Sequence, residues 1–164
     1  MAIKTKQRGF ALFVAVIFMS VMLTFGLALG SLGYKQQVLA SAAIESQYAF
    51  YAADAALECA LHADQQLNLF AHSIPRPSSA PLMVCAADTA FSSSVLSWNA
   101  NQWVVTERFS LDSDTRCADI TVYKPASASD TTYIFSQGYN VSCATVAAPG
   151  DARFSSRGLN VRYP

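Results

Sequence analysis

The sequence predicts an α+β protein in which a long N-terminal helix, transmembrane in its first half, packs on an antiparallel sheet of about four strands. Three observations lead to this fold class. The apolar stretch Phe10–Gly33 contains no charged residue. No proline occurs before Pro75, and the helical pattern continues beyond the apolar stretch to about Leu69. From residue 103 onward, β-branched and aromatic segments alternate with turn-forming residues.

The beginning of the chain predicts a membrane anchor. Met1–Gly9 is a short leader that carries Lys4, Lys6 and Arg8. The apolar stretch after it would reach roughly 36 Å as a helix, enough to cross a hydrocarbon core of about 30 Å. A secretory signal peptide would have a shorter apolar region with a small-residue cleavage site at its end. Because the basic residues precede the span, the positive-inside rule puts the N-terminus in the cytoplasm and the rest of the chain outside.

The junction between leader and span is more specific than that of a generic anchor. The segment KQRGFALFVAVIFMSVML resembles the class III leader of type IV pilins and pseudopilins. The resemblance implies that a prepilin peptidase cuts between Gly9 and Phe10 and that the new amine of Phe10 is methylated. Val14 departs from the family, since pilins usually carry Glu at the fifth residue after the cut. A Glu there would pair with a neighbour's cationic N-terminus, because an isolated charge in an apolar filament core is costly.

Two further segments resemble the same family. Gln47–Leu61 (QYAFYAADAALECAL) is similar to a segment of PilX-like minor pilins, with Asp54 in place of the usual Glu and Ala56 in place of Gly. Gln137–Asn140, together with Cys143 and the terminal GLNVRY, resembles their closing strands. Minor pilins of the PilX type and tip pseudopilins of the GspK type also lack the Glu that Val14 replaces. The middle of the chain carries no such resemblance.

The resemblance implies a minor pilin or pseudopilin, a structural subunit of a type IV pilus or a type II secretion-like filament. Val14 favours a priming or tip role over a bulk subunit. Its expected partners are other pilin subunits through the N-terminal helix, the prepilin peptidase and the inner membrane, before transfer to the pilus at the cell surface. The alternative is a non-polymerising single-pass membrane protein that displays a small disulfide-stapled binding domain, in which Val14 is one more lipid-facing residue.

The sequence divides into five segments on this interpretation. They are a leader at 1–9, a transmembrane helix at 10–33, a periplasmic continuation of the helix at 34–70, a Pro/Ser-rich linker and irregular loop at 71–102, and a β-sheet region at 103–164. A short helical turn is expected near Phe91–Leu96, within the loop. The expected strands are Trp103–Leu111, Ala118–Lys124, Thr132–Val141 and Arg153–Arg162.

Four cysteines lie in the part expected outside the cytoplasm: Cys59, Cys85, Cys117 and Cys143. An even number in an oxidising compartment indicates two disulfides, for which the sequence alone allows three connectivities. Cys117 and Cys143 flank a candidate hairpin with its turn near Ser129–Asp130, which favours a Cys117–Cys143 bond and leaves Cys59 for Cys85. A zinc site made of Cys59, His62, His72 and Cys85 is the weaker alternative.

The helix beyond the membrane carries two apolar stripes at helical spacing. One consists of Ile44, Tyr48, Tyr51, Ala55 and Cys59, and the nearly opposite one of Phe50, Ala53, Leu57 and Leu61. A helix packed on one domain needs a single apolar face. The second stripe therefore indicates either a neighbouring helix in an assembly or burial on both sides within one domain.

Composition and motifs point away from enzymes and nucleic-acid binders. Removal of the leader would leave eight basic and eleven acidic residues, a net charge of −3 without a clustered basic patch. Neither a nucleophile elbow nor a phosphate-binding glycine loop occurs, and we expect no catalytic residue, cofactor or metal. Asp112-Ser113-Asp114 resembles the start of a calcium loop but lacks the downstream Gly and Glu, so a polar turn is the favoured interpretation.

Overall fold

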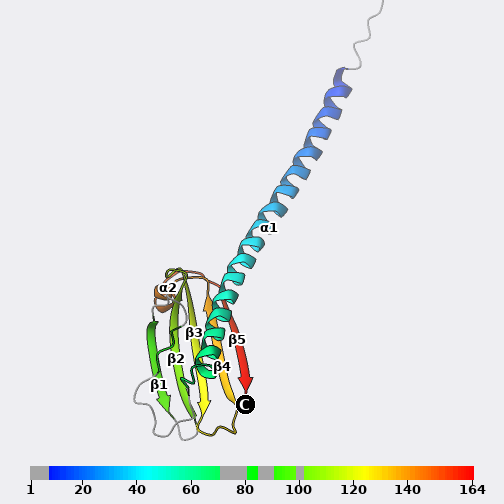
Figure 1. Cartoon of the computed structure of the whole chain (residues 1–164). Helices are drawn as coiled ribbons and strands as arrows, with labels where there is room; N and C mark the ends of the chain where they lie inside the picture. The colour runs from blue at the N-terminus through cyan, green and yellow to red at the C-terminus, as the bar shows by residue number, and fades with distance from the viewer. Residues whose placement is uncertain (1–7, 71–80, 85–90, 99–101) are drawn as a thin grey trace, which may run out of the picture. The chain divides into compact units, whose positions relative to one another are not determined.

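The computed structural model describes residues 8–70, 81–84, 91–98 and 102–164 and has the predicted α+β architecture (Figure 1). Two units make up the chain, Met1–Ala42 and Ala43–Pro164. In chain order the elements are α1 (Arg8–Gln65), β1 (Phe91–Trp98), β2 (Gln102–Leu111), β3 (Arg116–Pro125), β4 (Thr132–Tyr139), α2 (Cys143–Ala147) and β5 (Ser156–Tyr163).

The sheet is an antiparallel meander of five strands in the order β1-β2-β3-β4-β5. Four of these strands correspond to the predicted ones, and β1 is additional. The helical turn expected near Phe91–Leu96 is wrong, because this segment pairs with β2 from Phe91 opposite Phe109 to Trp98 opposite Trp103. Three consecutive serines in β1 weaken its strand signal in the sequence, whereas the neighbouring strand supplies a ladder of backbone partners.

Helix α1 ends four residues earlier than expected. Its last residue is Gln65, and the amides of Gln66 and Leu67 both donate to the His62 carbonyl. Asn68 follows with φ of 50°, a left-handed conformation that often terminates helices. The chain then folds back, and the amide of Leu69 donates to the Ala63 carbonyl.

A stripe of alanines lies between the second part of α1 and the sheet. Its buried members are Ala49, Ala52, Ala53, Ala56, Ala60 and Ala63. Small side chains allow a close approach, and Gly138 of β4 occupies the closest point. A Cβ atom at Gly138 would lie 2.2 Å from the Ala49 carbonyl oxygen and 2.3 Å from the Ala53 amide nitrogen. Helix and sheet therefore meet through backbone at this point.

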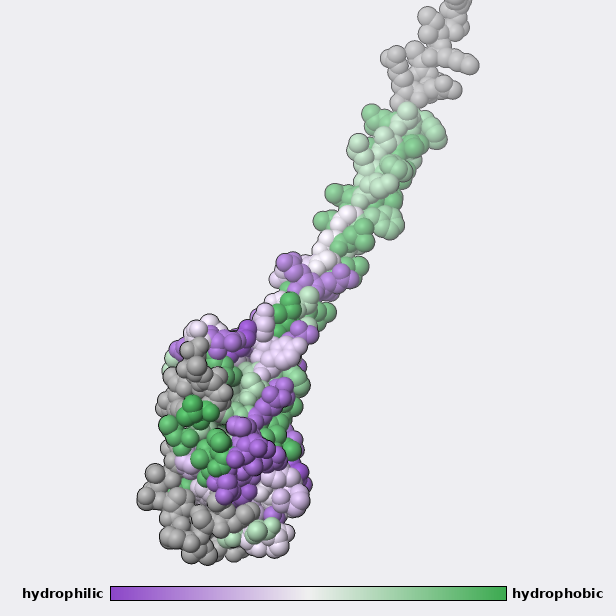
Figure 2. All heavy atoms as spheres, in the orientation of Figure 1, coloured by the Kyte–Doolittle hydropathy of each residue, from purple (hydrophilic) through white to green (hydrophobic). Residues whose placement is uncertain are grey.

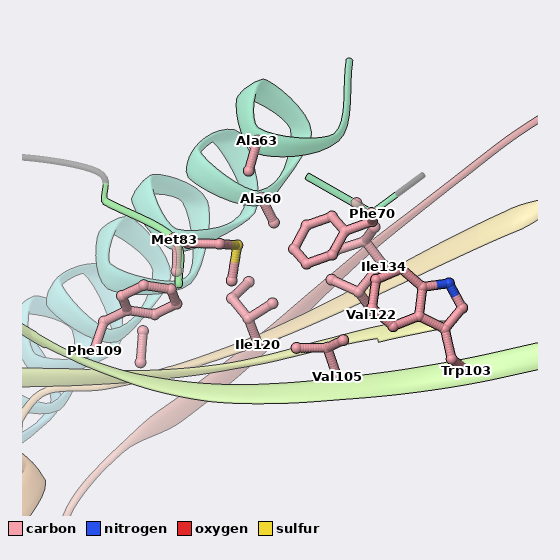
Figure 3. Packing of buried hydrophobic residues seen from close by; sticks show 12 residues of the cluster. Ala60, Ala63, Phe70, Met83, Trp103, Val105, Phe109, Ile120, Val122 and Ile134 are labelled. Carbon is pink, nitrogen blue, oxygen red and sulfur yellow. The ribbon is translucent and has the colours of Figure 1, made fainter. Parts of the chain in front are cut away.

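The larger core side chains come from the sheet and from the chain after α1 (Figure 3). Phe70 and Met83 are fully buried against the inward-facing residues of the strands. The ring of Phe70 meets that of Trp103 edge to face, with centroids 6.1 Å apart. In β2, β3 and β4, buried and partly exposed residues alternate as expected for a sheet covered on one face.

Candidate functional site

The first part of α1 presents exposed apolar side chains, which cover the face of the helix seen in Figure 2. From Phe10 to Leu32, every large hydrophobic residue is exposed within the chain. By length and composition, α1 is able to cross a membrane. The predicted cleavage residues Gly9 and Phe10 lie in its first turn, and the Phe10 side chain is 75% exposed. Met1–Gln7 of the leader lie outside the described residues.

Val14 lies on this apolar surface, where the described residues beside it in the lining of a hollow are all apolar. Together with Ile17, Phe18 and Val21 it lines a shallow hollow of about 240 Å³. Its side chain is 47% exposed. Any protein that covers this part of α1 would therefore meet a purely apolar surface at the position where the resembling family usually has a carboxylate.

The two predicted stripes on the second part of α1 have different environments. Ala53 is buried, and Leu57 and Leu61 pack against the core of the sheet. The opposite stripe is exposed at Ile44, Tyr48, Tyr51 and Ala55. The helix is thus not buried on both sides within the domain, and it leaves an aromatic surface exposed.

Phe50 and Cys59 differ from the simple two-stripe pattern. Helical spacing assigns Phe50 to the stripe that packs on the sheet, but its side chain is 43% exposed and its ring meets that of Tyr51 edge to face. It therefore enlarges the exposed aromatic surface. Cys59 is partly buried at the margin of the core and takes part in a disulfide.

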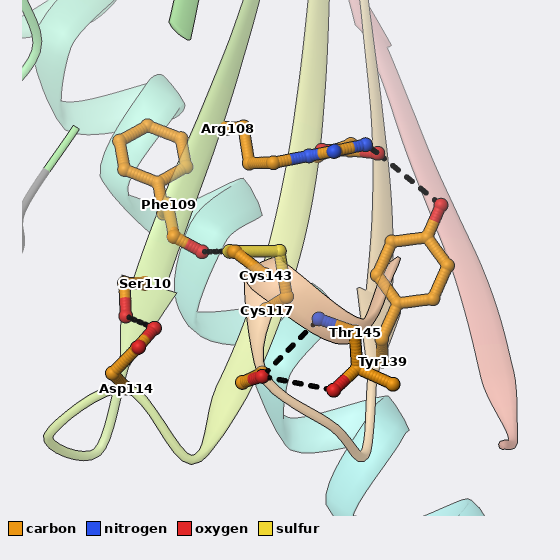
Figure 4. The surroundings of a disulfide bond; sticks show 10 residues. Arg108, Phe109, Ser110, Asp114, Cys117, Tyr139, Cys143 and Thr145 are labelled. Carbon is orange, nitrogen blue, oxygen red and sulfur yellow. Dashed lines mark hydrogen bonds and ion pairs between the residues drawn. A yellow bond between two sulfur atoms is a disulfide. The ribbon is translucent and has the colours of Figure 1, made fainter. Parts of the chain in front are cut away.

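The structure contains the favoured disulfide between Cys117 and Cys143, with Cα atoms 4.8 Å apart (Figure 4). Cys143 does not lie on the hairpin strand itself but opens the short helix α2, whose N-terminus is capped by the Ser142 side chain. The bond fixes α2 to β3. Cys59 is also disulfide-bonded, so it is not a free thiolate for the alternative zinc site. Its expected partner Cys85 lies outside the described residues, as does His72.

A hydrogen-bonded cluster lies beside this disulfide on the sheet face away from α1. Arg108 donates to both carboxylate oxygens of Asp119, at 2.6 and 2.8 Å. The Tyr139 hydroxyl donates to the same carboxylate at 3.2 Å, and Phe154 packs edge to face on the Tyr139 ring. Burial, together with the negative charge of Asp119, raises the pKa of Tyr139. The phenol therefore stays protonated and serves as a structural donor.

A second polar cluster joins the end of α1 to β3 and β5. Lys124 donates to both oxygens of Asp64 at 2.8 Å, and both side chains are nearly inaccessible to water. The hydroxyl of Tyr163 also donates to Asp64. Burial is the main cause that raises the pKa of Tyr163, and the bond to Asp64 adds to it. The cluster balances each buried charge with a partner, as buried ions require.

Glu107 is a buried acid with incomplete hydrogen bonding. Its side chain is fully buried on the inward face of β2. Oε2 accepts a long bond of 3.4 Å from the Met83 amide, whereas Oε1 has no partner among the described residues. Burial raises the pKa of this carboxyl to about 7, against a smaller lowering by the Met83 amide. Within the part of the chain that the structure describes, Glu107 belongs to no cluster of side chains that could hold a metal.

The two aspartates considered for calcium lie in the turn between β2 and β3. Asp112 forms an ion pair with Arg116, and Asp114 accepts a hydrogen bond from Ser110 at 2.6 Å. Asp112, Ser113 and Asp114 all have positive φ. The carboxylates of Asp112 and Asp114 thus bond to side chains at the two ends of the turn and do not converge on a common point.

Sequence reasoning missed both of these polar clusters and the buried Glu107. A signal for one of them existed, because Lys124 continues the inward-facing series Ala118, Ile120 and Val122 at a spacing of two. An inward-facing lysine implies a buried acid. Asp64, its partner, is 60 residues away in the sequence, and only the fold brings the two together.

Comparisons with protein-family models, with curated proteins and with solved structures gave no match to this chain.

Proposed function

We propose that the chain is a minor pilin or pseudopilin, a structural subunit of a type IV pilus or a type II secretion-like filament. The observation that carries the proposal is the surface of α1. Its first part is apolar on every side, and its second part keeps an exposed aromatic stripe after the alanine stripe has packed on the sheet. A helix with these properties is able to pack against apolar partners both in a membrane and in a helical assembly.

The leader is the second support for the proposal. Gly9 and Phe10 stand where a basic leader meets the apolar surface, and this is the arrangement that a prepilin peptidase recognises in the resembling family. Cleavage there would remove Lys4, Lys6 and Arg8 and make the amine of Phe10 the first group of the helix. Methylation of that amine would follow.

A priming or tip position fits Val14 better than a position in the shaft. A shaft subunit has to supply a partner for the charged N-terminus of its neighbour, because an unpaired charge in the apolar filament core is costly. Val14 lies in an apolar hollow and provides no acceptor for that charge. A subunit that begins the filament has fewer neighbouring N-termini to pair with, so it tolerates the loss of the carboxylate.

Intact-mass measurement of the protein from cells with and without a prepilin peptidase tests the assignment. We expect loss of Met1–Gly9 and gain of one methyl group only when the peptidase is present. Gly9→Leu should abolish the cut, whereas Ala11→Leu on the other side of the junction should leave it intact. An uncut wild-type chain in cells that process other prepilins would refute the proposal.

The second candidate is a non-polymerising membrane protein that displays a disulfide-stapled binding domain. Val14 favours it, because a chain that never polymerises has no need for the missing carboxylate. This candidate predicts an uncut leader and no incorporation into filaments. A processed chain distributed evenly along the shaft, with pilus number unchanged on its deletion, would instead contradict only the tip or priming role. We propose no enzymatic activity for either candidate.

A further inference from the structure

The C-terminal strand β5 is an edge of the sheet that no described element covers. It is the last strand in the order (Figure 1) and pairs on one side with β4 over eight residue pairs without a bulge. Its first three residues are exposed, and half-buried and exposed residues alternate from Leu159 onward. It contains no proline. Long edges of this kind are templates for pairing with another strand, and charged side chains on the edge disfavour added strands that carry the same charge.

The hydrogen bonds at the start of β5 determine which of its backbone groups point away from β4. The Asn140 amide donates to the Ser155 carbonyl, one pair beyond the strand in the same register. In an antiparallel ladder, alternate residues bond to the partner and the ones between them face away. Four residues of β5 therefore direct their amide and carbonyl groups to the open edge: Ser156, Gly158, Asn160 and Arg162.

The side chains on and near this edge are basic and lack acidic partners among the described residues. Arg153, Arg157 and Arg162 lie within the last twelve residues, which contain no Asp or Glu. Arg157 donates to the Ser46 hydroxyl, and Arg162 lies 5.1 Å from the centre of the Tyr133 ring. None of the ion pairs in the described part of the chain involves these three residues. The edge thus presents guanidinium groups that no described carboxylate neutralises.

A preformed hollow adjoins the strand at Arg162. Thr131, Tyr133 and Arg162 line a volume of about 350 Å³. Tyr133 is flanked by Tyr123 on β3, at 5.6 Å between ring centres, and by the guanidinium of Arg162 on β5. Stacking on an aromatic ring holds a guanidinium in place and leaves its N–H groups available to a carboxylate.

We propose that the open edge of β5 binds an extended acidic segment of another protein by strand addition. The backbone groups of alternate β5 residues supply the ladder, and a carboxylate of the added strand enters the hollow to meet Arg162, Thr131 and the Tyr133 hydroxyl. Affinity then comes from main-chain hydrogen bonds and selectivity from the side-chain hollow. A second copy of β5 is the poorer occupant, because it would bring further arginines and no carboxylate to the same edge.

The test uses the full chain in detergent micelles and a labelled, capped peptide of eight alternating valine and glutamate residues, equal in length to β5. Matched peptides carry glutamine or lysine in place of glutamate. We expect the acidic peptide to bind in a fluorescence-anisotropy titration and to slow hydrogen exchange of the amides of Gly158, Asn160 and Arg162. The glutamine peptide should bind about two- to fivefold more weakly for each carboxylate that pairs with an arginine, and the lysine peptide not at all.

Two pairs of variants separate the backbone and charge contributions. Asn160→Pro removes an outward amide without removing a bond to β4, as edge strands permit, and should abolish binding, whereas Asn160→Ala should preserve it. Arg162→Gln should remove the preference for glutamate over glutamine, and Arg153→Gln, outside the strand, should not. Circular dichroism of each variant verifies that the sheet is intact.

Several results would overturn the proposal. One is equal binding of the acidic and lysine peptides, and another is binding that survives Asn160→Pro in a folded protein. Absence of binding by the acidic peptide would do the same. If the wild type dimerised and Asn160→Pro prevented this, the edge would be assigned to a second copy of the chain. If the acidic polysaccharide alginate competed with the peptide and Asn160→Pro did not change this competition, the hollow would be assigned to a glycan.

Discussion

Glu107 is an acid placed among apolar groups, and its protonation therefore depends on folding. One carboxylate oxygen lacks a partner among the described residues and the other accepts a single long bond from Met83. Burial raises its pKa from 4.5 to about 7. Between these values the folded state binds a proton that the unfolded state has already lost, so the free energy of unfolding falls as pH rises from 4.5 to 7.

Glu107→Gln should remove this pH dependence while keeping the shape of the side chain. We expect wild type and variant to have similar unfolding free energies at pH 5, where Glu107 is neutral when folded. At pH 8 the variant should be more stable by about 2–3 kcal/mol, because it buries no charge. Chemical denaturation of the full chain in detergent at both pH values measures the difference.

Glu58→Gln is the matched control, since Glu58 is exposed on α1 and its removal should have little effect at either pH. If Glu107→Gln and wild type kept the same difference in stability at pH 5 and pH 8, the raised pKa would be refuted.

At the scale of elements, the contact between α1 and β4 depends on the absence of a side chain. Gly138 faces the backbone of α1 at Ala49 and Ala53. Backbone atoms on a helix cannot move aside independently, as the end of a flexible side chain can. The alanine stripe and Gly138 thus set the distance between helix and sheet together.

Gly138→Ala should destabilise the fold by about 3 kcal/mol or more, because its Cβ would overlap two backbone atoms of α1. Gly158→Ala on β5 is the control. There the new Cβ would lie 3.2 Å from the Phe135 ring, a side chain that is able to shift, so we expect a loss below about 1.5 kcal/mol. Thermal unfolding of both variants measures the ranking, and equal losses would contradict a backbone contact at Gly138.

At the scale of the whole molecule, the exposed aromatic surface of α1 links the folded domain to the proposed assembly. This surface is formed by Ile44, Tyr48, Phe50 and Tyr51. Arg116 from the turn end of β3 lies over the Tyr48 ring, with its guanidinium carbon 4.1 Å from the ring centre. The domain therefore holds one aromatic of the surface in place, and the others remain available to a partner.

Tyr51→Lys should block incorporation into filaments without unfolding the domain, because Tyr51 is 62% exposed and a charge there would have to be desolvated against a neighbouring helix. Gln65→Lys, exposed at the end of α1, adds the same charge outside this surface and should have no effect. Immunoblots of sheared filaments against whole-cell fractions measure incorporation. Normal incorporation of the Tyr51→Lys protein would refute a role for the surface in assembly.

The residues by themselves determined the α+β class, the long α1, four of the five strands and the Cys117–Cys143 bond. Each of these has a local signal: an unbroken apolar run without proline, alternation at a spacing of two, and two cysteines at similar distances from one turn. Helical spacing indicated two stripes on α1, although Phe50, which it assigned to the packed stripe, is exposed. It did not distinguish the one that packs on the sheet from the one left exposed.

Only the tertiary structure decided the features that depend on distant partners. β1 has a serine-rich sequence and is a strand because β2 lies beside it. Lys124 and Glu107 are both ionisable residues on the inward face of the sheet. Lys124 contacts Asp64 from the end of α1, whereas Glu107 contacts a single amide of Met83. The open edge of β5 likewise follows from strand order. Local sequence patterns indicate the preferences of a residue and its close neighbours. Burial, strand pairing and sheet edges depend instead on which residues far apart in the chain pack and hydrogen-bond with one another.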